Sequence, residues 1–112
     1  MRRSRGTTDR RWAAFAGGVL AANSTPHLVT AARMGHLLTP LAGPDSGPAA
    51  NLCWGAMNLT AASALVAVAR RSPRRILAPF ALGCAVFAAW ALLYERVIAP
   101  RAAASSASDV SS

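Results

Sequence analysis

The stretch Asn23-Ser24-Thr25-Pro26-His27 stands inside an apolar run that begins at Trp12 and meets no charged residue before Arg33. Such a run of polar and helix-distorting residues would be ordinary in a surface loop. At membrane depth, polar groups are tolerated mainly where they face other helices or a water-filled cavity. This stretch is therefore the best indication of where a functional or packing site lies.

The composition indicates a membrane protein. Of 112 residues, 54% are hydrophobic and 14% are charged, whereas soluble domains carry roughly 25% charged residues. All 12 basic residues are arginines, and they cluster at the ends of apolar runs instead of alternating with aromatics. That placement follows the positive-inside rule and does not suit a nucleic-acid surface. The expected partner is the lipid bilayer, not nucleic acid.

Three apolar segments predict an all-α, multi-pass transmembrane bundle of three spans. Each segment is long enough to cross a ~30 Å hydrocarbon core at ~1.5 Å per residue. The predicted spans are residues 12–34, 49–69 and 76–95. A loop rich in glycine and proline separates the first two spans.

The predicted bundle occupies residues 12–96, between a basic tail (1–11) and a tail rich in Ala and Ser (97–112). Both tails are expected to be disordered. Arg10-Arg11 followed by an apolar segment also resembles a secretory or twin-arginine signal. Cleavage would leave two further spans as cargo, so we interpret the segment as a retained first helix.

Pro26 predicts a kink in the first span. Proline removes one backbone donor and presses on the carbonyl of Ala22. In membrane helices Ser and Thr side chains often satisfy such freed groups, and Ser24 and Thr25 are adjacent.

Arginine placement predicts the orientation. Nine arginines precede span 1 or join spans 2 and 3, and three lie on the other side. The nine are Arg2, Arg3, Arg5, Arg10, Arg11, Arg70, Arg71, Arg74 and Arg75, and the three are Arg33, Arg96 and Arg101. The N-terminus is therefore expected in the cytoplasm and the C-terminus outside.

Helical spacing places Asn51, Asn58 and either Trp54 or Gly55 on one face of span 2. A second stripe repeats small residues every four positions, which favours close helix packing. That stripe is Ala56, Thr60 and Ala64.

Depth along the spans predicts a polar cluster. Asn23 lies ~16 Å and His27 ~22 Å from the inner face, counted from Trp12. Asn51 is placed at the outer face, and Asn58, seven residues further into the span, lies ~20 Å from the inner face. We therefore expect Asn58 to bond across to Asn23 or His27. The same counting places Cys53 and Cys84 too far apart for a disulfide.

Asn23-x-x-Pro26-His27, Thr39-Pro40 and Asn51-x-x-Trp54-Gly55-x-x-Asn58 resemble motifs of a group of small bacterial membrane proteins of unknown activity. The resemblance spans roughly residues 15–95. It implies a compact helical bundle in the inner membrane and no known activity.

Catalytic signatures are missing from the sequence. No carboxylate lies within a predicted span, and no nucleotide loop, metal-ligand cluster or nucleophile triad appears. We expect no cofactor and no metal, and the missing signatures weigh against enzymatic activity but leave the question open. His27 could shuttle protons or ligate a metal, but a lone histidine is more often a neutral ring bonded to a neighbouring helix.

Three functions fit these observations. The first is a structural or accessory role in a membrane complex or a self-associating bundle. The second is a small-molecule transport or redox module with a polar cavity between spans 1 and 2. The third is a holin-like permeabilising protein, which predicts toxicity on expression.

Overall fold

The regular secondary structure of the described residues is helical, as predicted. The computed structural model describes residues 2–70 and 76–111, and within these ranges it contains no β-strand beyond an isolated bridge between Thr39 and Gly43. The elements are α1 (Arg2–Ala32), α2 (Pro48–Ala69), α3 (Leu77–Leu93), the π-helical turn η2 (Tyr94–Ile98) and α4 (Ala99–Ser111).

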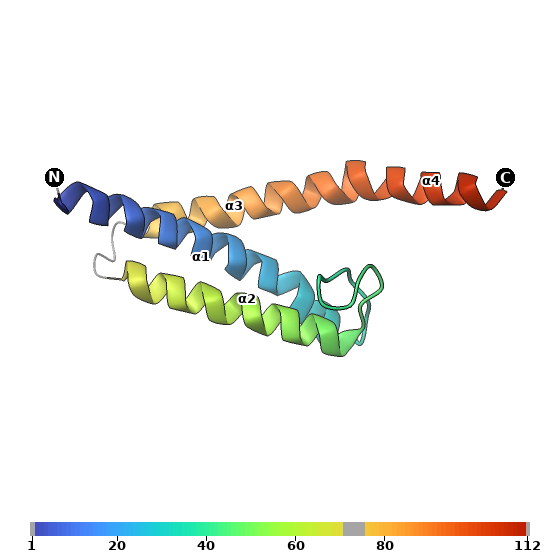
Figure 1. Cartoon of the computed structure of the whole chain (residues 1–112), viewed down its shortest axis with the longest axis horizontal. Helices are drawn as coiled ribbons and strands as arrows, with labels where there is room; N and C mark the ends of the chain where they lie inside the picture. The colour runs from blue at the N-terminus through green and yellow to red at the C-terminus, as the bar shows by residue number, and fades with distance from the viewer. Residues whose placement is uncertain (1, 71–75, 112) are drawn as a thin grey trace.

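Helix α1 is the central element, because both α2 and α3 pack against it. α2 returns antiparallel to α1 after a compact loop (Figure 1). α3, η2 and α4 form one continuous helix that follows α1 at first, then diverges and projects beyond the other two (Figure 1). The molecule is consequently elongated, with extents of 63 × 26 × 19 Å.

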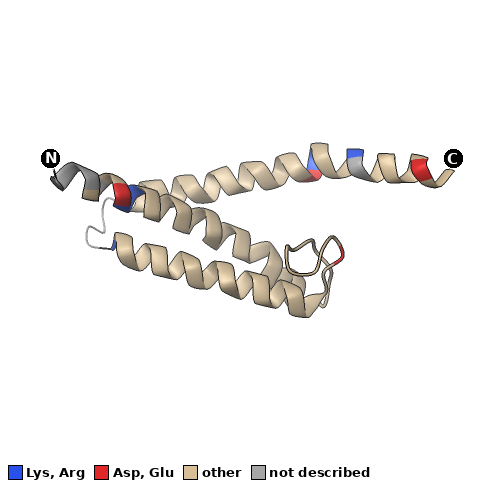
Figure 2. Cartoon of the chain, viewed as in Figure 1, with Lys and Arg blue, Asp and Glu red and all other residues tan. Residues whose placement is uncertain are grey.

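Two helices are long and apolar enough to cross a membrane: α2, and the continuous 35-residue helix Leu77–Ser111. α1 is not among them, because its polar stretch lowers its mean hydropathy. The charged side chains lie in the first part of α1, at the end of α2, in the loop and along η2 and α4, and the rest of α1, α2 and α3 carries almost none (Figure 2).

The contact between α1 and α2 uses the predicted face of α2. Its buried residues include Asn51, Gly55 and Asn58, followed by Ala62 and Ala69. The predicted stripe of small residues is wrong as a contact within the chain, since Ala56, Thr60 and Ala64 are all exposed. A repeat of small residues permits close approach, but the polar residues on the neighbouring face decide which side turns inward.

The contact between α1 and α3 depends on two glycines. A Cβ added at Gly18 would overlap the Phe80 carbonyl oxygen, and one added at Gly83 would overlap that of Phe15. The two backbones therefore touch directly. The Cys84 thiol also donates to the Gly18 carbonyl at 3.4 Å, and both cysteines are free.

Both ends differ from the expected disorder. α1 begins at Arg2, and residues 99–111 form α4. Extending an existing helix costs far less than nucleating one, and the tails are rich in the good helix formers Arg and Ala. The arginines at 71, 74 and 75, which contribute to the orientation argument, lie outside the described residues.

Candidate functional site

The polar residues of α1 and α2 pair across the interface. The Asn23 side-chain amide donates to Asn58 Oδ1 at 3.1 Å, and Asn58 Nδ2 donates to the Trp54 carbonyl at 2.8 Å. The expected contact between Asn23 and Asn58 is thus present. Trp54 is half-buried and contributes its backbone rather than its ring.

His27 pairs with Asn51 instead of Asn58. Its Nδ1 lies 2.8 Å from Asn51 Oδ1, and both side chains are buried. Its depth along span 2 placed Asn51 at the outer face, so Asn51 was not expected to pair with His27. It is instead enclosed, because the loop between α1 and α2 folds over the start of α2.

Asn51 joins this loop to the helices. Its Nδ2 lies within hydrogen-bond distance of three carbonyl oxygens: Leu37 (3.1 Å), Ser46 (2.8 Å) and Gly47 (3.0 Å). Because carbonyl oxygens only accept, the side-chain atom of Asn51 that faces them must be the nitrogen Nδ2. The oxygen Oδ1 therefore faces His27 and accepts from it. It follows that His27 carries a proton on Nδ1.

The loop has its own polar core. Thr39 and Ser46 share a hydrogen bond at 2.8 Å, and both are buried. Gly43 has a φ of +88°, a conformation that favours glycine. His36 and Asp45 form an exposed contact at 3.5 Å. The sequence predicted the loop but not this polar core. Closely spaced glycines and prolines indicate that the chain turns, but they do not indicate which side chains form hydrogen bonds within the turn.

The remaining residues of the polar stretch bond locally. Ser24 is buried and donates to the Ala21 carbonyl at 2.6 Å, and exposed Thr25 reaches the same oxygen at 3.4 Å. The anticipated side-chain bonding around Pro26 is present, although its acceptor is Ala21 and not Ala22. α1 continues through Pro26 as one helix, and the kink stays a prediction.

A groove opens beside His27, between α1 and α3. It encloses about 300 Å³. Asn23, Pro26 and His27 line its α1 wall, Phe87 and Trp90 its α3 wall, and Tyr94 and Glu95 follow on η2. The groove exists because α3 diverges from α1 beyond the glycine contact.

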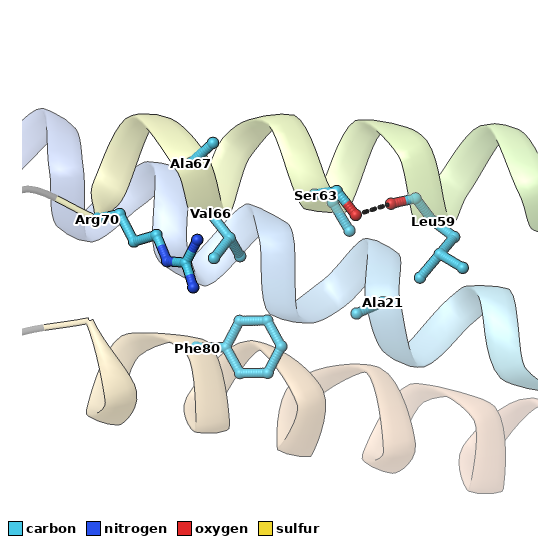
Figure 3. A pocket seen from close by; sticks show the side chains of 8 residues that line it. Ala21, Leu59, Ser63, Val66, Ala67, Arg70 and Phe80 are labelled. Carbon is cyan, nitrogen blue, oxygen red and sulfur yellow. Dashed lines mark hydrogen bonds between the residues drawn. The ribbon is translucent and has the colours of Figure 1, made fainter. Parts of the chain in front are cut away.

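A second groove of about 350 Å³ lies near the other end of the molecule, between α2 and α3. Ala21 of α1 contributes to its lining, and the Arg70 side chain reaches over it toward Phe80 (Figure 3). Its Ser63 hydroxyl already donates to the Leu59 carbonyl at 2.9 Å. This groove therefore offers a ligand little beyond apolar surface and one guanidinium.

Within the described residues, no group of three or more His, Cys, Asp or Glu side chains is placed to hold a metal ion. Every buried side-chain nitrogen or oxygen there has a hydrogen-bond partner. The cluster of Asn23, His27, Asn51 and Asn58 is thus an internally satisfied network.

No protein-family model, curated protein or solved structure matches the chain. The geometry of the chain itself therefore carries the functional argument.

Proposed function

We propose that the chain is a three-span protein of the bacterial inner membrane with a structural or accessory role in a membrane complex. One observation carries the proposal: the polar side chains between α1 and α2 bond to each other and to the loop. A paired interior favours a rigid scaffold over a passage for a substrate. The predicted cavity between these two helices is correspondingly disfavoured.

The exposed apolar surface supports the same role. Of the most apolar 18-residue segment of α2, 22% is buried within the molecule, and for the helix Leu77–Ser111, which contains α3, the share is 6%. Val86, Trp90 and Leu93 are among the large apolar side chains that α3 exposes. Such a surface suits lipid and a partner helix, where association depends on packing.

The charge distribution supports a cytoplasmic N-terminus. Asp9 and Arg10 of α1 line one cavity together with Ala67 and Val68 of α2, shortly before Arg70. A reporter active only in the cytoplasm should give signal in the turn after Arg70 and none when fused after Ser112. A bright C-terminal fusion would contradict the three-span arrangement.

Site-specific photo-crosslinking in native membranes tests the accessory role. A crosslinker at exposed Val86 should yield one discrete protein adduct, whereas one at buried Ala62 should react within the chain. An adduct of twice the chain's own mass would identify self-association. Crosslinks from Val86 to lipid alone would overturn the proposal.

Small-molecule binding is a second candidate, favoured by the groove beside His27. That groove lies against α3 and not between α1 and α2, so it differs from the cavity that the sequence suggested.

A further inference from the structure

His27 presents one unused ring nitrogen. The side chain is only 6% exposed, and its one hydrogen bond, through Nδ1, goes to Asn51. Nε2 has no hydrogen-bond partner among the described residues. Every fully buried side-chain nitrogen or oxygen among them does have a partner, so Nε2 is not fully buried. Nε2 therefore keeps some accessible surface, and His27 lines the groove between α1 and α3.

The chemistry of this nitrogen follows from its neighbour. Asn51 Oδ1 accepts, so Nδ1 carries a ring proton, and in the tautomer with its one proton there Nε2 carries a lone pair. An accessible acceptor at the end of an otherwise buried ring suits a ligand that donates a hydrogen bond.

The other wall supplies aromatic surface and a second acceptor. Phe87 and Trp90 lie on α3, and Glu95 lies within the π-helical turn η2. Turns of this kind frequently occur at functional sites. A volume of about 300 Å³ is at the small end of the range for ligand sites, which combine apolar walls with a few polar groups.

We propose that this groove binds a flat aromatic diol of the hydroquinone class, entering from the lipid phase. One hydroxyl donates to His27 Nε2 and the other to the Glu95 carboxylate, while the ring packs against the wall formed by Phe87 and Trp90. His27 on one wall and Glu95 on the other offer two acceptors, and Phe87 and Trp90 on the same helix as Glu95 offer the ring an aromatic surface. Such binding neither requires nor excludes a partner protein.

Nitrogen NMR of the full-length chain in lipid nanodiscs tests this assignment. The chain has two histidines, and loop residue His36 serves as an internal control. An alkyl-substituted para-hydroquinone should shift the His27 Nε2 resonance saturably and leave His36 unchanged. Its dimethyl ether, which keeps the shape but lacks both donors, should leave His27 unchanged.

Variants separate specific binding from partition into lipid. Trp90→Leu should weaken hydroquinone binding by up to about tenfold, the scale of one aromatic contact. Trp12→Leu is the matched control, because Trp12 is exposed and does not line this groove. Glu95→Gln should also weaken binding by removing a charged acceptor.

Several results would overturn the assignment. Equal responses to the hydroquinone, its dimethyl ether and a long-chain alcohol would indicate lipid-like occupancy. A proton found on Nε2 in the absence of ligand would also overturn the assignment. Equal losses of hydroquinone binding in Trp12→Leu and Trp90→Leu would overturn it as well. Loss of binding in Trp90→Leu and Glu95→Gln with an unchanged His27 response in Trp12→Leu supports it.

Discussion

The two contacts of α1 use opposite chemistry. Toward α2 it presents Asn23 and His27, which bond to Asn58 and Asn51. Toward α3 it presents Gly18, where a missing side chain lets the backbones meet. Polar side chains specify the contact with α2, whereas the lack of a side chain at glycine permits the contact with α3.

The difference separates register from distance. Hydrogen bonds between side chains fix which residues lie opposite each other, because a shifted helix would leave polar groups unpaired in an apolar setting. A glycine contact fixes how closely the axes approach and tolerates little added volume. α2 should therefore hold its position even when individual bonds are lost, whereas α3 should respond sharply to a single methyl group.

The largest expected effect is that of Gly83→Ala. The new Cβ would overlap the Phe15 carbonyl oxygen and lie 3.0 Å from the Val19 nitrogen, and these backbone atoms cannot rotate away. We expect a loss of about 3 kcal/mol in the free energy of unfolding, the upper end for overpacking. Unfolding in mixed detergent micelles measures it.

Gly6→Ala is the matched control, since nothing lies within 4 Å of a Cβ built there. Equal stability of the two variants would mean that α3 does not pack on α1 through Gly83.

The next effect is that of Asn51→Ala. The substitution leaves His27 Nδ1 and the Leu37 carbonyl without the Asn51 side chain as partner, while the Ser46 carbonyl keeps its bond from the Leu37 backbone nitrogen. An unsatisfied buried group costs about 1–3 kcal/mol, and we expect about 2 in the same unfolding assay. Proteolysis should also become faster within the loop.

Thr60→Ala provides the comparison, because exposed Thr60 bonds only to the Ala56 carbonyl of its own helix. If Asn51→Ala is as stable as Thr60→Ala, the loop is not held by Asn51.

A smaller effect is the coupling between Asn23 and Asn58. A double-mutant cycle with alanine at both positions should give about 0.6 kcal/mol, with ~1.7 as the upper value for such bonds in membranes. The His27 and Asn58 pair should couple less, since each has another partner. The reverse order would show that the pairing is misassigned.

The smallest effect is that of Ala56→Leu. Because Ala56 is exposed, the change should alter the stability of the monomer by less than about 0.5 kcal/mol. Ala62→Leu, at a buried position of the same helix, should destabilise it clearly. Loss of self-association in Ala56→Leu alone would assign the exposed stripe of small residues to contacts between copies.

Helical periodicity predicted one side of the site. Asn51, Gly55 and Asn58 recur at the spacing of one helix face, and that face is buried. Depth along the spans gave Asn23 and His27 as alternative partners of Asn58, and the bond that forms is the one to Asn23. Such features depend on the geometry of one helix and a rough alignment of two.

Features that depend on the third dimension were not predictable. The chain contains eight glycines, and nothing in their local sequence marks Gly18 and Gly83 as the pair that meets. The choice of Asn51 as the partner of His27 depends on a loop that closes over α2. Span boundaries alone therefore placed Asn51 at a surface that the loop in fact covers.

The continuous helix from Leu77 to Ser111 acts as a lever with its pivot at the glycine crossing. Ser111 lies about 42 Å along the axis from Gly83, more than the ~30 Å of a hydrocarbon core. A tilt of ~10° about the crossing would move that end by roughly 7 Å. Phe87, Trp90 and Glu95 lie on this helix between the glycine crossing and Ser111, so such a tilt would change the width of the groove and the position of the C-terminal end together.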